Sequence, residues 1–247
     1  MTTKKEYDVA IIGGGPNGLI CGAYLARAGL RVVILEARHE TGGGLDTFEF
    51  AGFRFNPHAI YHMMADYMPP HKDLALDTRG VKYIYPDVQC AYINKDTNPL
   101  LFYRDPKKTA DYLSANFSPA DGQAYQQMYS DFKAFSEEIL MPLTYVPPVP
   151  AIEQTQILDA AGDVGRRFND IADETPLEIL NAYNFNEPVK AGLLNLFLMW
   201  GMSPYEVGFL FPLYVYRMTQ SALVAGGSHR LSSAIYRAFI EAGGEVL

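Results

Sequence analysis

The sequence predicts an α/β fold, and three consecutive segments near its beginning carry the prediction. Residues 7–12 read YDVAII, a short apolar strand that runs into glycines. Residues 16–28 repeat apolar side chains at helical spacing, and Gly29 stands where a helix commonly ends. Residues 31–35 read RVVIL, a strand of the kind that is buried on both faces of a sheet. Strand, helix and strand within about 30 residues form a βαβ unit.

The turn between the first strand and the helix has the glycine spacing GxGxxG. Gly13 allows the tight turn, Gly15 lets backbone N–H groups approach a pyrophosphate, and Gly18 lets the helix pack on the strand. Pro16 costs no hydrogen bond in a first helical turn, and the positive end of the helix favours phosphate. The motif therefore predicts a dinucleotide site. A glycine turn of structural use only is the alternative, since GxGxxG alone is a weak signal.

Glu36 ends the second strand, 18 residues after Gly18. A carboxylate at this place accepts hydrogen bonds from a ribose diol and repels a 2′-phosphate. The spacing thus favours a dinucleotide without that phosphate and disfavours NADP, while NAD and FAD both remain.

The rest of the chain is predicted to be short strands followed by helices. Strands are expected in the segments FEFAGFRFNP, VKYIYPDVQCAYIN and LLFYRD. Asp105 and Ser118, each followed by proline, mark helix starts. The pattern over 107–216 is mostly helical, with a proline-rich loop at 141–150. A glycine turn at 224–227, a helix over 230–242 and the start of a strand at 245–247 follow.

A second glycine run follows the acidic residue: Glu36, Ala37 and Arg38 precede Gly42, Gly43 and Gly44. This arrangement resembles the FAD-binding start of the glutathione-reductase-like flavoproteins. Within that group, the chain is most similar to the phytoene-desaturase-like, amine-oxidase-related oxidoreductases. Those proteins follow the second glycine motif with a segment like GFRFNPHA, and they return to the FAD domain through a segment like residues 225–246.

The resemblance implies FAD as the cofactor and assigns roles by position. The residues expected at the pyrophosphate are Gly13, Gly15, Pro16, Asn17 and Gly18. Glu36 would take the adenosine ribose with Ala37 and Arg38 beside it, and Gly42, Gly43 and Gly44 would line the path to the flavin. Many relatives carry Arg where Gly44 stands, so one contact is missing here or supplied otherwise.

The resemblance also implies a domain organisation and an activity. A Rossmann-like FAD domain is expected from residues 1–75 and 217–247, with a mixed strand and helix substrate domain, mostly helical, inserted at 76–216. We expect an oxidoreductase of the dehydrogenase or desaturase type, or the FAD-binding subunit of a heteromeric one, acting on a small apolar organic substrate. The alternatives are a non-catalytic nucleotide-binding subunit of a larger complex and an NAD-dependent dehydrogenase.

The sequence predicts a partner chain and argues against nucleic acid as a partner and against a transmembrane segment. It stops within the expected strand at 245–247, so either a second polypeptide supplies the C-terminal half of the fold or the sequence is a fragment. A formal net charge of −8 disfavours nucleic acid. Ser203, Pro204 and Glu206 interrupt the apolar stretch 191–216, which predicts buried core segments and no transmembrane helix, while peripheral membrane contact stays open.

The remaining reactive side chains predict little chemistry of their own. Cys21, expected inside the first helix as a buried residue, and Cys90 are interpreted as reduced thiols of a cytoplasmic protein. His58, His62, Asp66 and His71 cluster in the sequence without completing a metal ligand set, so no metal site is expected. By resemblance, His58 falls near the isoalloxazine; a structural histidine is the alternative.

Overall fold

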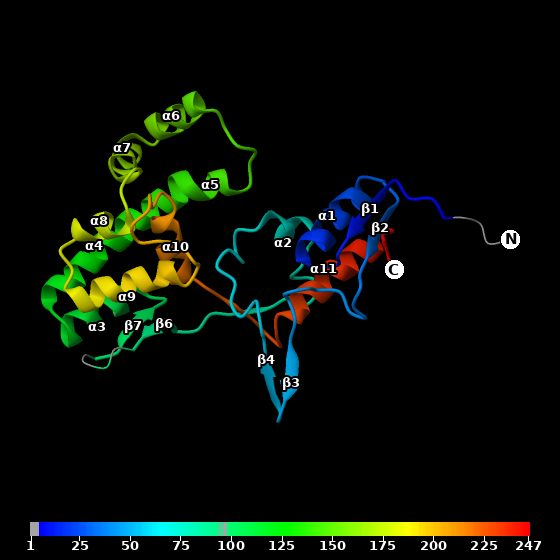
Figure 1. The fold of residues 1–247 in the computed structure, drawn as a ribbon, viewed down its shortest axis with the longest axis horizontal. Helices are drawn as coiled ribbons and strands as arrows, with labels where there is room; N and C mark the ends of the chain where they lie inside the picture. Colours follow the sequence, from blue (N-terminus) through cyan, green and yellow to red (C-terminus); the bar gives the residue numbers. More distant parts are fainter. Residues whose placement is uncertain (1–4, 94, 96–97) are drawn as a thin grey trace. The chain divides into compact units, whose positions relative to one another are not determined.

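The computed structural model describes residues 5–93, 95 and 98–247, which form two compact units (Figure 1). The first unit is Met1–Tyr85 with Ala222–Leu247, and the second is Pro86–Ser221. Strand β5 (Tyr83–Ile84) pairs antiparallel with β8 (Leu223–Val224), which ties both segments to the first unit. The unit boundaries lie ten residues beyond 75 and five residues beyond 216. Asn94, at the end of one expected strand segment, lies outside the described residues.

The first unit is built on a three-stranded parallel sheet. Strand β1 (Val9–Ile12), helix α1 (Pro16–Arg27) and strand β2 (Val32–Leu35) form the predicted βαβ unit. Strand β9 (Glu245–Val246) pairs parallel with β2, so the order is β1-β2-β9. Helix α11 (His229–Glu241) leads into β9. The α/β fold class and the Rossmann-like arrangement predicted from the sequence are confirmed.

Helices α1 and α11 share the core of the first unit with one face of this sheet. Leu19, Ile34 and Phe239 are fully buried in that core. Gly22 makes the close packing possible, because a Cβ there would lie 3.0 Å from the ring of Phe239. Burying one such side chain stabilises the fold by roughly 1.5–3 kcal/mol.

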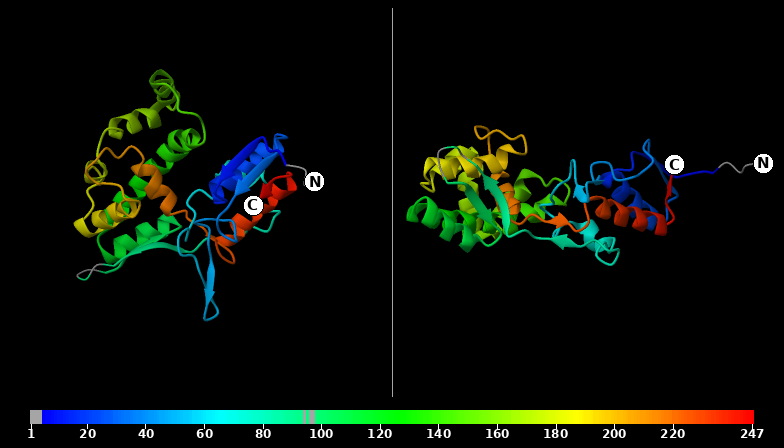
Figure 2. Two further views of the ribbon diagram at one scale, coloured as in Figure 1. Left: turned by 45° about the vertical axis from the view of Figure 1, so that its right-hand side comes forward. Right: turned by 90° about the horizontal axis from the view of Figure 1, so that it is seen from below.

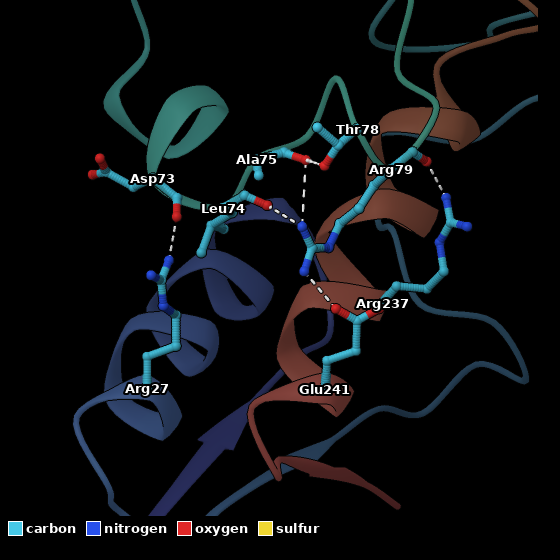
Figure 3. A network of polar contacts seen from close by, with 8 residues as sticks. All are labelled: Arg27, Asp73, Leu74, Ala75, Thr78, Arg79, Arg237 and Glu241. Atoms are coloured by element: carbon cyan, nitrogen blue, oxygen red, sulfur yellow. Dashed lines mark hydrogen bonds and ion pairs between the residues drawn. The ribbon is translucent and has the colours of Figure 1, made fainter.

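A polar network fixes the loop after helix α2 (Pro69–Asp73) to α1 and α11 (Figure 3). Arg27 donates to the carbonyl oxygen of Asp73, and Arg79 forms an ion pair with Glu241. Arg79 also donates to the carbonyl oxygen of Leu74 at 2.8 Å. Arg237 donates to the carbonyl oxygen of Arg79. The loop thereby links α1 and α11, the two helices that pack on the sheet.

The second unit is a helical assembly with one small antiparallel ladder (Figure 2). Strands β6 (Val88–Tyr92) and β7 (Leu100–Tyr103) form the ladder. The helices are α3 (Pro106–Asn116), α4 (Pro119–Phe135), the π-helix η1 (Ser136–Leu140), α5 (Met141–Thr144), α6 (Ala151–Ala160), α7 (Gly162–Ile171), α8 (Pro176–Asn181), α9 (Glu187–Leu198) and α10 (Phe211–Met218). Asp105 and Ser118 cap α3 and α4 as predicted.

Two local expectations are wrong. Cys21 is exposed, because the buried side of α1 is set by Leu19, Ala23 and Ala26, and a residue two places from Leu19 points to the opposite side. The expected loop 141–150 begins with the helical turn of α5, because Leu140 and Met141 keep helical backbone angles and the chain continues directly from η1 into α5.

The apolar stretch 191–216 forms the end of α9 and most of α10. Phe197 and Phe211 are buried, with their rings 5.3 Å apart. The connection between the helices is more open, since Met199 is 56% and Tyr205 74% exposed. Among the described residues, no helix has the length and hydropathy to cross a membrane.

Asp121 is a buried carboxylate that joins two segments of the second unit. It lies in α4 and is fully buried. It accepts hydrogen bonds from the backbone N–H of Asn186 at 2.8 Å and from the side-chain amide of Asn186 at 2.7 Å. The Ser118 hydroxyl donates to it at 2.6 Å. All these donors require an acceptor at this position.

We expect Asp121→Asn to lower the free energy of unfolding by about 2–3 kcal/mol, because its amide turns one acceptor into a donor facing donors. Chemical denaturation followed by the fluorescence of Trp200, the single tryptophan and part of the same unit, measures the loss. Asp111→Asn removes an exposed helical ion pair with Lys107 and should change stability by less than about 0.5 kcal/mol. Equal effects of the two variants would contradict the prediction.

Candidate functional site

The glycine turn between β1 and α1 has a geometry that two of its glycines make possible. Gly13 has φ +97° and donates its N–H to the carbonyl oxygen of Leu35 at 2.8 Å. A Cβ on Gly18 would collide with the carbonyl oxygen of Gly13. Gly15 is the N-cap of α1 and has no side chain to cap the first turn, while Pro16 stands within that turn. The N-terminus of α1 is thus framed by backbone alone.

The second glycine run packs directly on the first. The N–H of Gly42 donates to the carbonyl oxygen of Gly14 at 2.8 Å. A Cβ on Gly43 would lie 3.1 Å from the Cα of Gly15. Gly42 and Gly43 have φ +127° and +53°, conformations that favour glycine. Two segments nearly 30 residues apart in the sequence therefore form one continuous strip of backbone.

Glu36 holds this strip together through its carboxylate. One oxygen, Oε2, accepts the N–H of Gly14 at 2.7 Å, and the other, Oε1, accepts the N–H of Arg38 at 2.9 Å. The hydrogen bonds from Arg38 and Gly14 lower the pKa of Glu36 below its usual value. Each carboxylate oxygen keeps a further lone pair that can accept a hydroxyl. This contact with the glycine turn was not predicted from the sequence.

The other expected site residues lie around the strip. Arg38 forms an ion pair with Asp46 at 3.2 Å, and its guanidinium lies 3.4 Å from the carbonyl oxygen of Gly43. Asn17, in the first turn of α1, and Ala37, directly after Glu36, are both exposed. A Cβ on Gly44 would lie 3.9 Å from the Cβ of the exposed His58. The structure therefore brings all the residues of the two motifs into one region of the first unit.

A cavity of about 560 Å³ opens beside Glu36. Its lining includes residues that the sequence did not indicate: His39, Glu40, Thr41, His229, Ser232, Ser233, Tyr236, Arg237 and Leu247. Ser232 touches the second glycine run, since a Cβ on Gly42 would lie 2.8 Å from its hydroxyl oxygen. For the residues His229, Ser232, Ser233, Tyr236 and Arg237, the signal in the sequence was the segment 225–246, whose resemblance placed it in the same domain.

The histidines considered for a metal have other neighbours in the structure, and the rings of both His62 and His71 lie near the ring of Tyr83. His62 pairs through its backbone with Ala222, and burial lowers its pKa. The ring of His71 lies 5.4 Å from that of Tyr83. His58 lies beside Gly44. Across the described ranges, no three His, Cys, Asp or Glu side chains group as metal ligands.

The geometry suits a phosphate-containing ligand with a diol. Backbone N–H groups at the N-terminus of α1, with the positive end of the helix dipole, attract an anion. Bare backbone at Gly15 and Gly43 permits close approach, and the remaining lone pairs of Glu36 suit hydroxyl donors. Phosphate and ribose of a dinucleotide meet these requirements.

Comparison with known sequences identifies the same region. Residues 11–77 match the family described as NAD(P)-binding Rossmann-like domain. The chain is 43% identical over its whole length to one limonene dehydrogenase subunit from Castellaniella defragrans and covers 45% of that protein. Over 59% of its length, it is 32% identical to rat pyridine nucleotide-disulfide oxidoreductase domain-containing protein 2, of which it covers 26%. The chain thus spans less than half of the length of these relatives.

Solved structures share the fold at low sequence identity. A variant of putrescine oxidase matches with a TM-score of 0.56 and 19% identity, over 97% of this chain and 50% of that one. Rab GDI from Plasmodium falciparum matches with a TM-score of 0.55 and 12% identity, over 97% and 57%. The CLA-producing fatty acid isomerase from P. acnes matches with a TM-score of 0.50 and 21% identity, over 95% and 50%.

These likenesses agree with the resemblance drawn from the glycine motifs. The family match covers both glycine runs and Glu36. The similarity to a dehydrogenase subunit extends from end to end of the chain. The chain is therefore similar along its whole length to a protein named as a dehydrogenase subunit, contains an NAD(P)-binding Rossmann-like region, and shares the fold of putrescine oxidase.

Proposed function

We propose that this chain is the FAD-binding part of an oxidoreductase of the dehydrogenase or desaturase type, acting on an apolar organic substrate. One observation carries the proposal: Glu36, the glycine turn and the second glycine run meet at the N-terminus of α1. The relative's name, which describes it as part of a limonene dehydrogenase, supports the activity and the apolar substrate class. The inserted segment 76–216, which contains most of the second unit, is our candidate for the substrate domain.

The residues of the first unit fit FAD in the following way. The N-terminus of α1, with Gly13, Gly15, Pro16, Asn17 and Gly18, would hold the pyrophosphate. Glu36 would accept the ribose hydroxyls, with the neighbouring cavity available to the rest of the adenosine. Gly42 to Gly44 would line the path to the flavin, with His58 near its ring. When bound, FAD supplies the acceptor for the electrons and hydrogen that leave a substrate C–H bond.

The second glycine run favours FAD over NAD. A dinucleotide site of the simple βαβ kind needs the first turn and the acid. Here the second glycine run packs against the first. The surface formed by backbone without side chains therefore extends beyond the proposed pyrophosphate position. The family description names NAD(P), so NAD-dependent dehydrogenation is the second candidate, while Glu36 disfavours a 2′-phosphate.

We also propose that further polypeptide covers this unit. The similar protein from Castellaniella defragrans is named a subunit, and this chain spans 45% of it. Parallel sheets are nearly always covered on both faces, yet Ile12 is 88% and Leu35 43% exposed on the face opposite α1 and α11.

Among the described residues both cysteines are free, and we place the protein in the reducing cytoplasm.

A non-catalytic nucleotide-binding role is the alternative from another class. The fold is shared by proteins named as an oxidase, an isomerase and Rab GDI, so fold alone does not decide. Reduction of bound flavin by an apolar substrate separates the roles. A flavin that stays oxidised with every hydrocarbon or alcohol substrate offered would favour the binding role.

The direct test is purification of the chain together with added FAD, followed by desalting and an absorption spectrum. We expect flavin bands near about 370 and 450 nm, in about one equivalent per chain. NAD⁺ serves as the competing arm of the experiment. Retention of NAD⁺ with no flavin bands would replace the proposal by the second candidate.

A matched glycine pair tests the turn itself. Gly13 and Gly29 have φ +97° and +91°, and a Cβ at either would meet nothing within 4 Å. Alanine at each should cost a similar strain of about 1–2 kcal/mol. Only Gly13→Ala should weaken FAD binding, by at least about tenfold in calorimetric titration. The placement of the site would be wrong if Gly29→Ala weakened binding equally.

The pKa of Glu36 predicts how binding depends on pH. Because this pKa is lowered in the folded protein, the carboxylate contacts are complete above the ordinary glutamate pKa and are lost as pH falls through the lowered value. FAD affinity should therefore stay level from about pH 8 to about pH 5 and fall below about pH 4. Glu36→Gln should bind weakly and show no such fall. A wild-type midpoint above about pH 5 would contradict the assignment.

A further inference from the structure

A β-hairpin of the first unit carries an apolar face of four aromatic rings. Strands β3 (Phe48–Phe50) and β4 (Phe53–Phe55) pair antiparallel, with Glu49 opposite Arg54. Directly opposed residues lie on the same face of a hairpin. The phenylalanine face therefore consists of Phe48, Phe50, Phe53 and Phe55. The other face carries the ion pair between Arg54 and Glu49, whose charged atoms are 3.6 Å apart.

The phenylalanine face is open to solvent. Its four residues are 51%, 70%, 69% and 44% exposed in chain order. Phe48 and Phe55 stack at 5.4 Å, but in the described part of the chain no further strand pairs with the hairpin. An isolated two-stranded hairpin is marginal in water, and contiguous exposed aromatic surface marks an interaction site. This face therefore requires a covering partner.

The base of the hairpin is firmly held. Thr47 donates to the side-chain oxygen of Asn56 at 2.7 Å, which closes the stem. The N–H of Ser228 donates to the same oxygen of Asn56 at 3.0 Å, and the N–H of His229 donates to the Thr47 hydroxyl at 3.1 Å. The start of α11 thus fixes the direction in which the hairpin projects (Figure 1). Because these hydrogen bonds fix the base of the hairpin, the exposed face has a defined orientation within the first unit.

We propose that the phenylalanine face is the docking surface for the polypeptide that relatives of this fold carry beyond the part matched here. The inference rests on the proposed covering polypeptide and names where it binds. The chain spans 50% of putrescine oxidase and 45% of the limonene dehydrogenase subunit. At least half of each of these proteins therefore lies outside the matched part. Four clustered aromatic rings are the kind of anchor that buried protein interfaces use.

Charge favours polypeptide over lipid as the occupant. Within residues 46–57 the charged side chains are Asp46, Glu49 and Arg54. Arg54 is paired with Glu49 on the opposite face, and Asp46 is paired with Arg38. Interfacial membrane elements instead surround their apolar face with lysine and arginine that attract anionic headgroups. The hairpin has no such excess of positive charge.

The test is co-expression of this chain with a second, tagged polypeptide, which is the unmatched portion of the limonene dehydrogenase subunit. We expect a complex in size-exclusion chromatography, and protection of the four rings from carbene labelling. Phe50→Ser combined with Phe53→Ser should weaken the complex at least about tenfold. Glu49→Gln, on the opposite face of the same hairpin, should change affinity less than about twofold. Thermal melts verify that both variants fold.

Four outcomes would overturn the inference. They are the absence of a complex, a serine variant that binds like the wild type, self-association of the chain that the serine variant abolishes, and binding of the chain to phosphatidylcholine vesicles through these rings. Flavin absorbance of the same samples keeps the two proposals apart. A complex without flavin leaves the docking surface standing and removes the proposed function, and a flavin-loaded chain insensitive to the serine variant does the reverse.

Discussion

The contact between the Glu36 carboxylate and the backbone N–H of Gly14 is the interaction on which the candidate site depends. It joins the end of β2 to the turn after β1, and a second hydrogen bond from Arg38 fixes the carboxylate itself. The carbonyl oxygen of Gly14 in turn accepts the N–H of Gly42. One side chain therefore aligns the first glycine run, the strand end and the second glycine run. It acts together with the backbone hydrogen bonds from Gly13 to Leu35 and from Gly42 to Gly14.

The sequence predicts local features well because their causes are local. Glycine spacing, the apolar strands and the Asp105 and Ser118 caps act within a few residues, and the structure confirms these elements. Features that depend on distant segments were missed. Ser232 lies next to the second glycine run although it is about 190 residues away in the sequence, and no local pattern around Gly42 predicts this contact. The exposure of Cys21 was also missed, because helical apolar spacing alone did not show which side of α1 meets Phe239.

The fold of this protein is supported by sequence similarity, whereas its activity and substrate are proposals. The Rossmann-like region and the similarity to an oxidoreductase subunit are established along the chain. Activity and substrate are set by individual sites, and the shared fold alone does not determine them. The first unit exposes two apolar surfaces, which are the sheet face with Ile12 and Leu35 and the phenylalanine face. Both are surfaces of the kind that further polypeptide usually covers. The proposed cofactor binding and the proposed assembly therefore involve different surfaces of the first unit.

Hydrogen exchange of the chain with and without FAD tests the central claim most directly. The proposed site uses backbone groups, so bound FAD must slow exchange at the amides of Gly15, Asn17, Gly18, Gly43 and Gly44, while the amides of α4 and α9 in the second unit remain unchanged. The Gly14 amide should be slow already without FAD, because Glu36 accepts its hydrogen bond. Saturating FAD without added protection in both glycine runs would contradict the account.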